Sequence, residues 1–283
     1  MLLAFFWEIQ HASFFTKNLA YNEGDNIESG DEMGQITDQL RQTFVEVYGT
    51  EPEASFFAPG RVNLIGEHTD YNGGHGFTLG TYAWVKPRSD KKLRLYSDNF
   101  PKDGIRELDM TDLAYRGSDS WANYVKGVFV YLENLEFAFP HGMDIAFYGN
   151  IPNGSGLSSS ASFELLVGVI ARKVYSLDID TLSLVKVGKR VENDFIGVNS
   201  GIMDQFAVGM GKKDHAIFLD CATLEYELVP VKLGDYRIVI MNTNKRRELA
   251  DSKYNERFAE TRIALKELQE HVSIDSLGEL TID

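Results

Sequence analysis

The stretch GSGLSSSAS, residues 154–162, places two glycines and five serines directly before an apolar helical pattern. Glycines let a backbone approach phosphate oxygens closely, and the first N–H groups of a helix lack partners within it. The stretch lies between a predicted strand and a predicted helix, so it favours an anion-binding loop over a flexible linker. It is not a Walker A loop, because that pattern needs a lysine before its serine or threonine.

A second polar cluster lies in the turn-rich segment GRVNLIGEHTDYNGG, residues 60–74. Arg61, Glu67, His68 and Asp70 fall within ten positions, and carboxylates accept pairs of hydrogen bonds from sugar hydroxyls. Acidic residues in turns also form purely local hydrogen bonds, and a lone histidine is more often structural. Metal binding by the last three of these residues would fit no standard zinc spacing. The segment is therefore a candidate site for a small polar ligand.

Two acidic residues follow in VENDFIGVNSGIMDQF, residues 191–206. Glu192 stands at the end of a predicted helix and could complete a Mg²⁺ site, because this ion prefers oxygen ligands and keeps substrate phosphates in its shell. Asp204 stands in a turn or at the start of the next helix and could accept the proton of an attacking hydroxyl. Taken singly, each could equally be a solvated surface residue, and it is the phosphate loop that gives them a shared chemistry.

The elements that must position these residues alternate without a regular βαβ order, which indicates the α+β class. Apolar spacing predicts helices over 36–48, 121–135, 162–177 and 248–271, and another that begins after an N-cap at Asp180. Strands are predicted from residue 54 onward and over 92–97, 142–152, 215–220, 225–231 and 236–243.

Composition excludes several classes of protein. The 283 residues carry a net charge of -14, which argues against nucleic acid or an anionic membrane as partner. No apolar run is long enough to span a bilayer, and the apolar N-terminus is a poor signal peptide because Glu8 interrupts it. A single cysteine fits a reducing cytoplasm.

Five segments occur in the order found in galactokinases: GRVNLIGEHTDYNGG, WANYVKG, PNGSGLSSSAS, GIMDQF and DSKYNERF. From about Ile36 to about Leu277 the chain resembles these members of the GHMP kinase family. The resemblance implies a GHMP-kinase-like two-domain α+β fold with the site in a cleft between the domains. It places a nearly complete N-terminal domain at 36–215 and part of a ferredoxin-like C-terminal domain at 216–283. Residues 1–35 resemble nothing in the family and are predicted to be a disordered leader.

The resemblance also implies an activity, the ATP-dependent phosphorylation of α-D-galactose at its 1-hydroxyl in the cytoplasm, by a monomer. Asp204 would be the catalytic base and Arg61 its partner, which lowers the pKa of the carboxyl and offsets developing charge. Ser160 and Glu192 would ligate Mg²⁺. The sugar would be held by Glu67, His68, Thr69, Asp70 and Tyr254. ATP would be held by Gly154, Ser155, Gly156, Leu157, Ser158, Ser159 and Ser160, with Ser97 near the nucleotide.

Three features differ from the family pattern. The third, glycine-rich motif that the family carries near its C-terminus is not in this chain, so residues 216–283 are expected to form an incomplete domain with exposed apolar strand edges. The stretch GHGFTLGTYAW is several residues shorter than its family counterpart, which is expected to shift a core strand beside the sugar site. The third difference from the family is the leader at residues 1–35. These differences leave three alternatives: a galactose- and ATP-binding sensor, an inactive truncated product, or a kinase for N-acetylgalactosamine.

Overall fold

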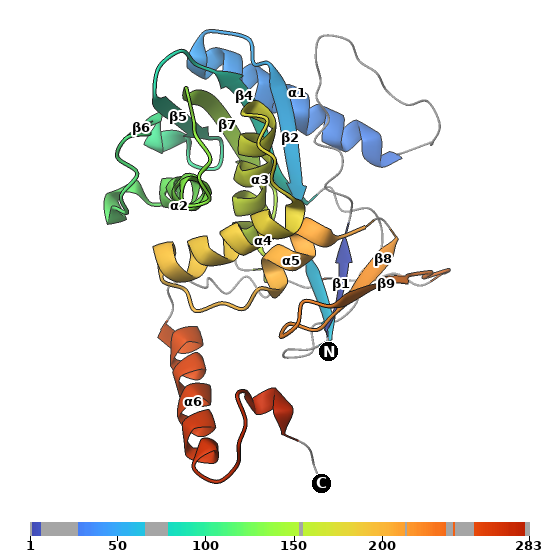
Figure 1. The fold of residues 1–283 in the computed structure, drawn as a ribbon. Helices are drawn as coiled ribbons and strands as arrows, with labels where there is room; N and C mark the ends of the chain where they lie inside the picture. Colours follow the sequence, from blue (N-terminus) through green and yellow to red (C-terminus); the bar gives the residue numbers. More distant parts are fainter. Residues whose placement is uncertain are drawn as a thin grey trace.

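A computed structural model describes residues 2–6, 28–65, 79–152, 155–212, 214–235, 240 and 252–280. The fold combines two sheets with helices that are not interleaved in a regular order, and the predicted α+β class is confirmed (Figure 1).

The larger sheet has five strands in the order β2-β4-β7-β5-β6. All neighbouring strands are antiparallel except β7 and β5, which are parallel. The bounds are β2 Ala54–Pro59, β4 Gly80–Pro87, β5 Lys92–Ser97, β6 Arg106–Asp109 and β7 Met143–Gly149. The central strands read as nearly continuous apolar runs, because helices cover both faces of the sheet.

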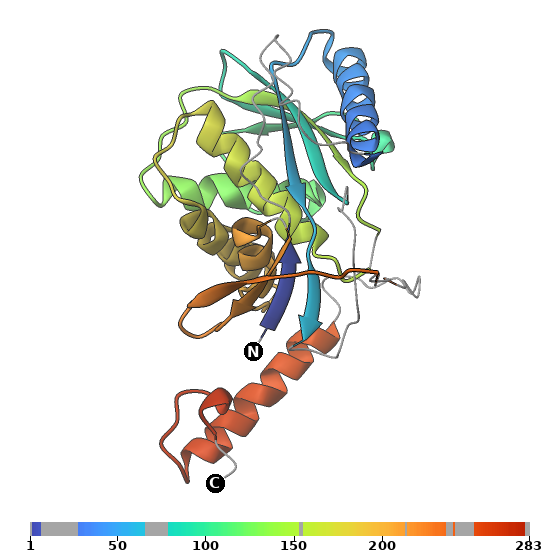
Figure 2. The same ribbon diagram turned by 90° about the vertical axis from the view of Figure 1, so that its right-hand side faces the viewer.

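One face of this sheet is covered by α1, Glu28–Tyr48, and the other by α2, Ala122–Glu133, and α3, Ser159–Val174 (Figures 1 and 2). Alternate residues of β4 separate the two cores, because successive side chains of a strand point to opposite faces. Tyr82 and Trp84 pack with Leu40 and Phe44 of α1, whereas the intervening Ala83 joins the larger core on the other side.

Two further helices complete the large core. Helix α4, Thr181–Arg190, begins at the predicted N-cap, where the Asp180 carboxylate accepts a hydrogen bond from the N–H of Ser183 at 2.6 Å. A π-helical turn, Val191–Ile196, follows it, and then α5, Met203–Met210. These two helices and the π-helical turn contact each other and pack against α3 or α2, so they hold residues 191–206 next to the start of α3.

The second sheet has four antiparallel strands in the order β3-β1-β8-β9. The bounds are β1 Leu2–Phe6, β3 Val62–Ile65, β8 His215–Leu219 and β9 Tyr226–Pro230. Helix α6, Ser252–Gln269, lies at one end of the molecule beyond this sheet (Figures 1 and 2). Short 3₁₀ turns lie at Pro101–Asp103, Gly117–Asp119 and Leu277–Glu279.

Two expectations from the sequence differ from this arrangement. Part of the predicted leader is ordered here, because Leu2–Phe6 pairs with both β3 and β8, and α1 begins at Glu28, eight residues before the expected start at Ile36. The strand that was expected to shift, β4, pairs along its length with both β2 and β7. The shortened segment itself falls mostly within 66–78, outside the described residues.

Candidate active site

The junction between β2 and β3 lies against the glycine- and serine-rich loop. A Cβ atom on Gly60 would lie 2.8 Å from the backbone oxygen of Leu157, so only glycine lets the two segments approach this closely. The next N–H, that of Arg61, donates to the same oxygen at 3.1 Å. The Arg61 guanidinium also donates through Nη1 to the oxygen of Gly156. The first motif thus holds the loop directly.

The loop enters α3 through a strained residue. Ser158 stands at the N-cap position with φ 57° and ψ 55°, a left-handed conformation that is uncommon outside glycine. Its hydroxyl makes no capping hydrogen bond, so the first N–H groups of α3 are not satisfied by the side chain that most often does so. The helix start is fixed instead by buried Ser162, whose hydroxyl donates to the oxygen of Ala58 in β2 at 2.8 Å. The loop therefore presents a rigid and uncapped helix start.

Asp204 lies in the first turn of α5 and is held by two of the predicted residues. Arg61 donates to Asp204 Oδ1 from Nε at 2.9 Å and from Nη2 at 2.7 Å. The Ser158 hydroxyl donates to the other carboxylate oxygen, Oδ2, at 2.6 Å. The side chains of Arg61 and Asp204 are 11% and 27% exposed, so the ion pair is partly shielded from water while one edge of the carboxylate stays accessible. Three segments far apart in the sequence thus meet at one carboxylate.

The two predicted metal ligands lie on neighbouring elements. Ser160 is the second residue of α3, and Glu192 lies in the π-helical turn with 4% of its surface exposed. Glu192 Oε2 accepts a hydrogen bond from the hydroxyl of Ser200 at 2.7 Å, which orients the carboxylate. Among the described residues no three His, Cys, Asp or Glu side chains form a metal-binding group. Ser160 and Glu192 therefore offer oxygen donors but no complete protein cage.

A third carboxyl group, which the sequence did not single out, lies inside this region. Glu164 of α3 is buried, and Gln205 donates to its Oε2 from Nε2 at 3.1 Å. Burial raises the pKa of the Glu164 carboxyl well above its ordinary value, and the charges of Glu192 and Asp204 raise it further. A signal was present in the sequence: Glu164 interrupts an apolar run whose flanking positions are all expected to be buried.

The remaining predicted residues are placed only in part. The sugar-binding residues Glu67, His68, Thr69 and Asp70, and Gly154 of the loop, lie outside the described residues. Tyr254 lies in the first turn of α6, and its side chain is not described. Ser97 is buried at the end of β5, where it pairs with Phe147 of β7. The structure thus brings together Arg61, Ser158 and Asp204, and leaves the sugar-binding set as a prediction.

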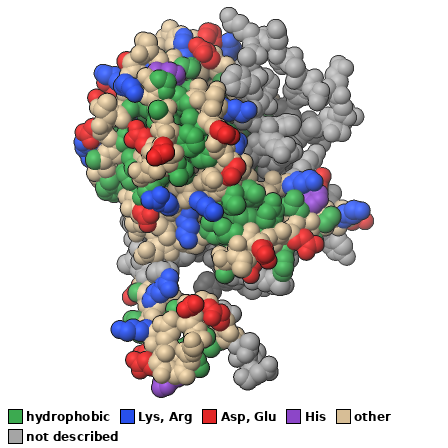
Figure 3. Space-filling view, viewed as in Figure 1, with side chains coloured by type: hydrophobic (Ala, Val, Ile, Leu, Met, Phe, Trp, Pro, Cys, Tyr) green, Lys and Arg blue, Asp and Glu red, His purple; other side chains and the backbone are tan. Residues whose placement is uncertain are grey.

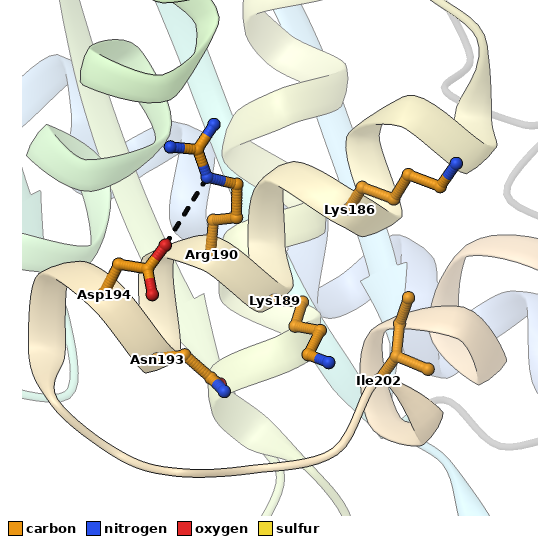
Figure 4. A pocket seen from close by; sticks show the side chains of 6 residues that line it. All are labelled: Lys186, Lys189, Arg190, Asn193, Asp194 and Ile202. Atoms are coloured by element: carbon orange, nitrogen blue, oxygen red, sulfur yellow. Dashed lines mark hydrogen bonds and ion pairs between the residues drawn. The ribbon is translucent and has the colours of Figure 1, made fainter. Parts of the chain in front are cut away.

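A separate surface hollow lies on the far side of α4 from the sheet. It is lined by Lys186, Lys189, Arg190, Asn193, Asp194 and Ile202 (Figure 4). Figure 3 shows basic side chains gathered over α4 on this face. Arg190 is already engaged, since it pairs with Asp194 at 3.5 Å and stacks over the ring of Tyr131. None of the predicted site residues lines this hollow, so it is not the candidate active site.

No helix among the described residues combines the length and the hydropathy needed to cross a membrane.

Comparisons with known proteins identify similar sequences and folds. Residues 123–212 match the family described as GHMP kinases N terminal domain, and residues 42–82 match the galactokinase galactose-binding signature. The chain is 59% identical over 248 residues to a galactokinase of Streptococcus suis, and 60% identical over 245 residues to one of Enterococcus faecalis. These matches cover 86% and 85% of this chain, and 64% and 63% of the relatives.

Among solved structures, the chain is similar to the Lactococcus lactis galactokinase complexed with galactose. The TM-score is 0.81 at 52% sequence identity, and the match covers 87% of this chain and 65% of that one. The chain thus spans less than two thirds of the length of the relatives it matches. Over that span the chain has the fold and both sequence signatures of the galactokinases of the GHMP kinase family.

Proposed function

We propose that this chain catalyses the ATP-dependent phosphorylation of galactose at its 1-hydroxyl. The observation that carries the proposal is the Asp204 carboxylate, which Arg61 and Ser158 orient directly beside the uncapped start of α3. A carboxylate that can accept a proton and a helix start that can bind phosphate are the two parts that phosphoryl transfer to a hydroxyl requires.

The two oxygens of Asp204 have different roles in this reaction. Oδ1 receives two hydrogen bonds from Arg61, so its lone pairs are already engaged. Among the described residues Oδ2 accepts only the Ser158 hydroxyl, so a lone pair is left for the proton of the galactose 1-hydroxyl. The sugar oxygen attacks the γ-phosphorus of ATP while its proton passes to Oδ2, and the bond from phosphorus to the leaving ADP oxygen breaks. An anomeric hydroxyl is more acidic than an ordinary alcohol, which eases this transfer. Arg61 offsets the charge that develops during the reaction.

The phosphates of ATP would lie against the loop 155–160. Gly156 has φ 72° and carries no side chain that would obstruct an approaching oxygen, and the Ser158 side chain does not cap the first N–H groups of α3. Ser160 and Glu192 supply only oxygen donors, which fits Mg²⁺ better than softer metals. When bound, Mg²⁺ would neutralise charge on the phosphates, and the phosphates themselves would complete its coordination.

Galactose as the acceptor is supported by the match of residues 42–82 to the galactose-binding signature and by the galactose complex of the Lactococcus lactis relative. Within the matched segment, Glu67, His68, Thr69 and Asp70 are proposed to hold the sugar hydroxyls, and Tyr254 to close over the ring. N-acetylgalactosamine remains the alternative acceptor, because it differs from galactose only at one position of the ring.

A coupled assay of ADP release with galactose and MgATP tests the proposal. Asp204→Asn should lower kcat by a factor of at least about 10², since general base catalysis contributes about 10²- to 10⁴-fold. Asp178→Asn, a change of the same type at an exposed residue, should leave kcat unchanged. If the chain shows no turnover but still binds galactose in calorimetry, the proposal of a kinase is wrong and the chain is a galactose-binding sensor. If the chain neither turns over nor binds galactose, it is an inactive product. If it phosphorylates N-acetylgalactosamine faster than galactose, N-acetylgalactosamine is the acceptor.

A further inference from the structure

Glu164 and Gln205 form an isolated polar contact where α3 packs against α5. Glu164 is 1% exposed and Gln205 is 0% exposed, and a single hydrogen bond of 3.1 Å joins Gln205 Nε2 to Glu164 Oε2. The other oxygen of each side chain, Oε1 in both, has no hydrogen-bond partner among the described residues. Two apolar side chains of this size would be easier to bury, so packing alone does not account for the pair.

The neighbouring helix leaves room for this pair. A Cβ atom on Gly188 of α4 would lie 3.0 Å from Gln205 Cγ and 3.2 Å from Glu164 Oε2. These separations are tighter than ordinary van der Waals contact, so alanine at this position would press on both partners. Three helices thus meet at the pair, and the absence of a side chain on α4 allows it.

Among the described residues no ion pair explains the burial of Glu164. The titratable groups that act on its pKa come from the neighbouring π-helical turn and from α5, namely Glu192 and Asp204, and both are acidic. From α2, the pKa of the Tyr124 phenol is raised mainly by burial and further by the charges of Glu192 and Glu164. None of these groups is a cation, so the hydrogen bond to Gln205 is the interaction that holds the Glu164 side chain in place.

The position of the pair relates it to the candidate base. Gln205 follows Asp204 directly in the first turn of α5, and Glu164 lies one turn beyond Ser160 on α3. We propose that the Glu164–Gln205 hydrogen bond is a positioning device that fixes the first turn of α5 on α3, and so holds Asp204 against the phosphate loop. This inference rests on the proposed function for its effect on rate, but the contact itself does not depend on it.

The test compares three variants of the full chain. Glu164→Leu removes the hydrogen bond and should lower kcat on the order of 10²-fold with little change in KM for galactose, because small misplacement of a catalytic group costs about this much. The exchanged pair, Glu164→Gln with Gln205→Glu, keeps one acid and one amide and should restore most of the rate. Val169→Ala, a buried truncation elsewhere on α3, should lower stability but leave kcat unchanged.

Amide hydrogen exchange of residues 203–206 supplies a readout that needs no turnover. Glu164→Leu should accelerate exchange in this turn, whereas Val169→Ala should not. Equal kcat in Glu164→Leu and Val169→Ala, or an exchanged pair as slow as Glu164→Leu, would overturn the proposal. If the unmodified chain shows no turnover, the proposed function fails, but hydrogen exchange still tests the positioning role. Equal exchange of residues 203–206 in Glu164→Leu and Val169→Ala would then overturn the positioning role.

Discussion

Replacing Glu164 with glutamine should change how the stability of this protein depends on pH. Burial is the main cause that raises the pKa of this carboxyl well above its ordinary value, and the charges of Glu192 and Asp204 raise it further. Between the unfolded and the folded pKa, the folded protein therefore holds a proton that the unfolded chain has released. The unfolded state binds fewer protons in this range, so the free energy of unfolding falls as the pH rises.

The magnitude follows from linkage. One proton contributes a slope of about 1.4 kcal/mol per pH unit, so between the unfolded and the folded pKa of Glu164 the free energy of unfolding should fall with a slope that approaches this value. This contribution is fully present below the unfolded pKa and is lost as the pH rises toward the folded pKa. Glutamine has the same shape and does not titrate, so Glu164→Gln should lack the slope.

Urea unfolding at several pH values, followed by tryptophan fluorescence with a chelator present, measures this difference. The chelator keeps cations off the neighbouring carboxylates. Glu133→Gln, the same change at an exposed position of α2, is the control and should parallel the unmodified protein. If Glu164→Gln also runs parallel to the unmodified protein, Glu164 does not keep its proton on folding, and the reasoning from burial and like charge is refuted.

Three further changes test other contacts. Ser158→Ala should lower kcat about 3- to 10-fold, because it removes a hydrogen bond of about 0.5–1.5 kcal/mol to Asp204, and the coupled assay measures this. Gly60→Ala should destabilise the chain by about 1–3 kcal/mol in urea, since its Cβ would lie 2.8 Å from a backbone oxygen of the loop, whereas Gly34→Ala meets nothing within 4 Å and should not. Lys126→Met should cost about 1.5–3 kcal/mol, because it removes the ion pair between the buried Lys126 ammonium and the partly exposed Asp119; unchanged urea midpoints would contradict both stability predictions.

The regular helices and several strands could be predicted from the sequence, because their apolar spacing reports burial on one side. The predicted N-cap at Asp180 and the predicted helix end at residue 48 are confirmed, and Gly49 directly after this end has φ 69°. Strand β4 could be expected only from the family resemblance and not from an alternating pattern, since helices cover both its faces and Tyr82 and Ala83 are both buried. Strand β1 had no pattern of its own, because its place depends on pairing with β3 and β8, which lie far away in the sequence.

The candidate site could be predicted as a set of residues but not as a set of contacts. The motifs identified Arg61, Ser158 and Asp204, yet Ser158 was expected to bind phosphate, and in the structure its hydroxyl donates to Asp204. A left-handed serine at a helix start leaves no trace in local sequence, because serine is common at N-caps in the extended conformation. Glu164 does interrupt an apolar run, but the sequence does not show that α4 and α5 also pack around this side chain and bury it.

These contacts bear on how variants at the site should combine. Arg61 fixes one oxygen of Asp204 from the β2–β3 junction, and Ser158 fixes the other from the phosphate loop. Glu164 acts on the backbone that carries the carboxylate, through Gln205. Because the three constraints converge on one group, losing one leaves the other two in place, and losing two allows rotation that neither loss permits alone. The free-energy effects of Ser158→Ala and Glu164→Leu on kcat should therefore not add, whereas the effects of either with Val169→Ala, which touches none of these contacts, should.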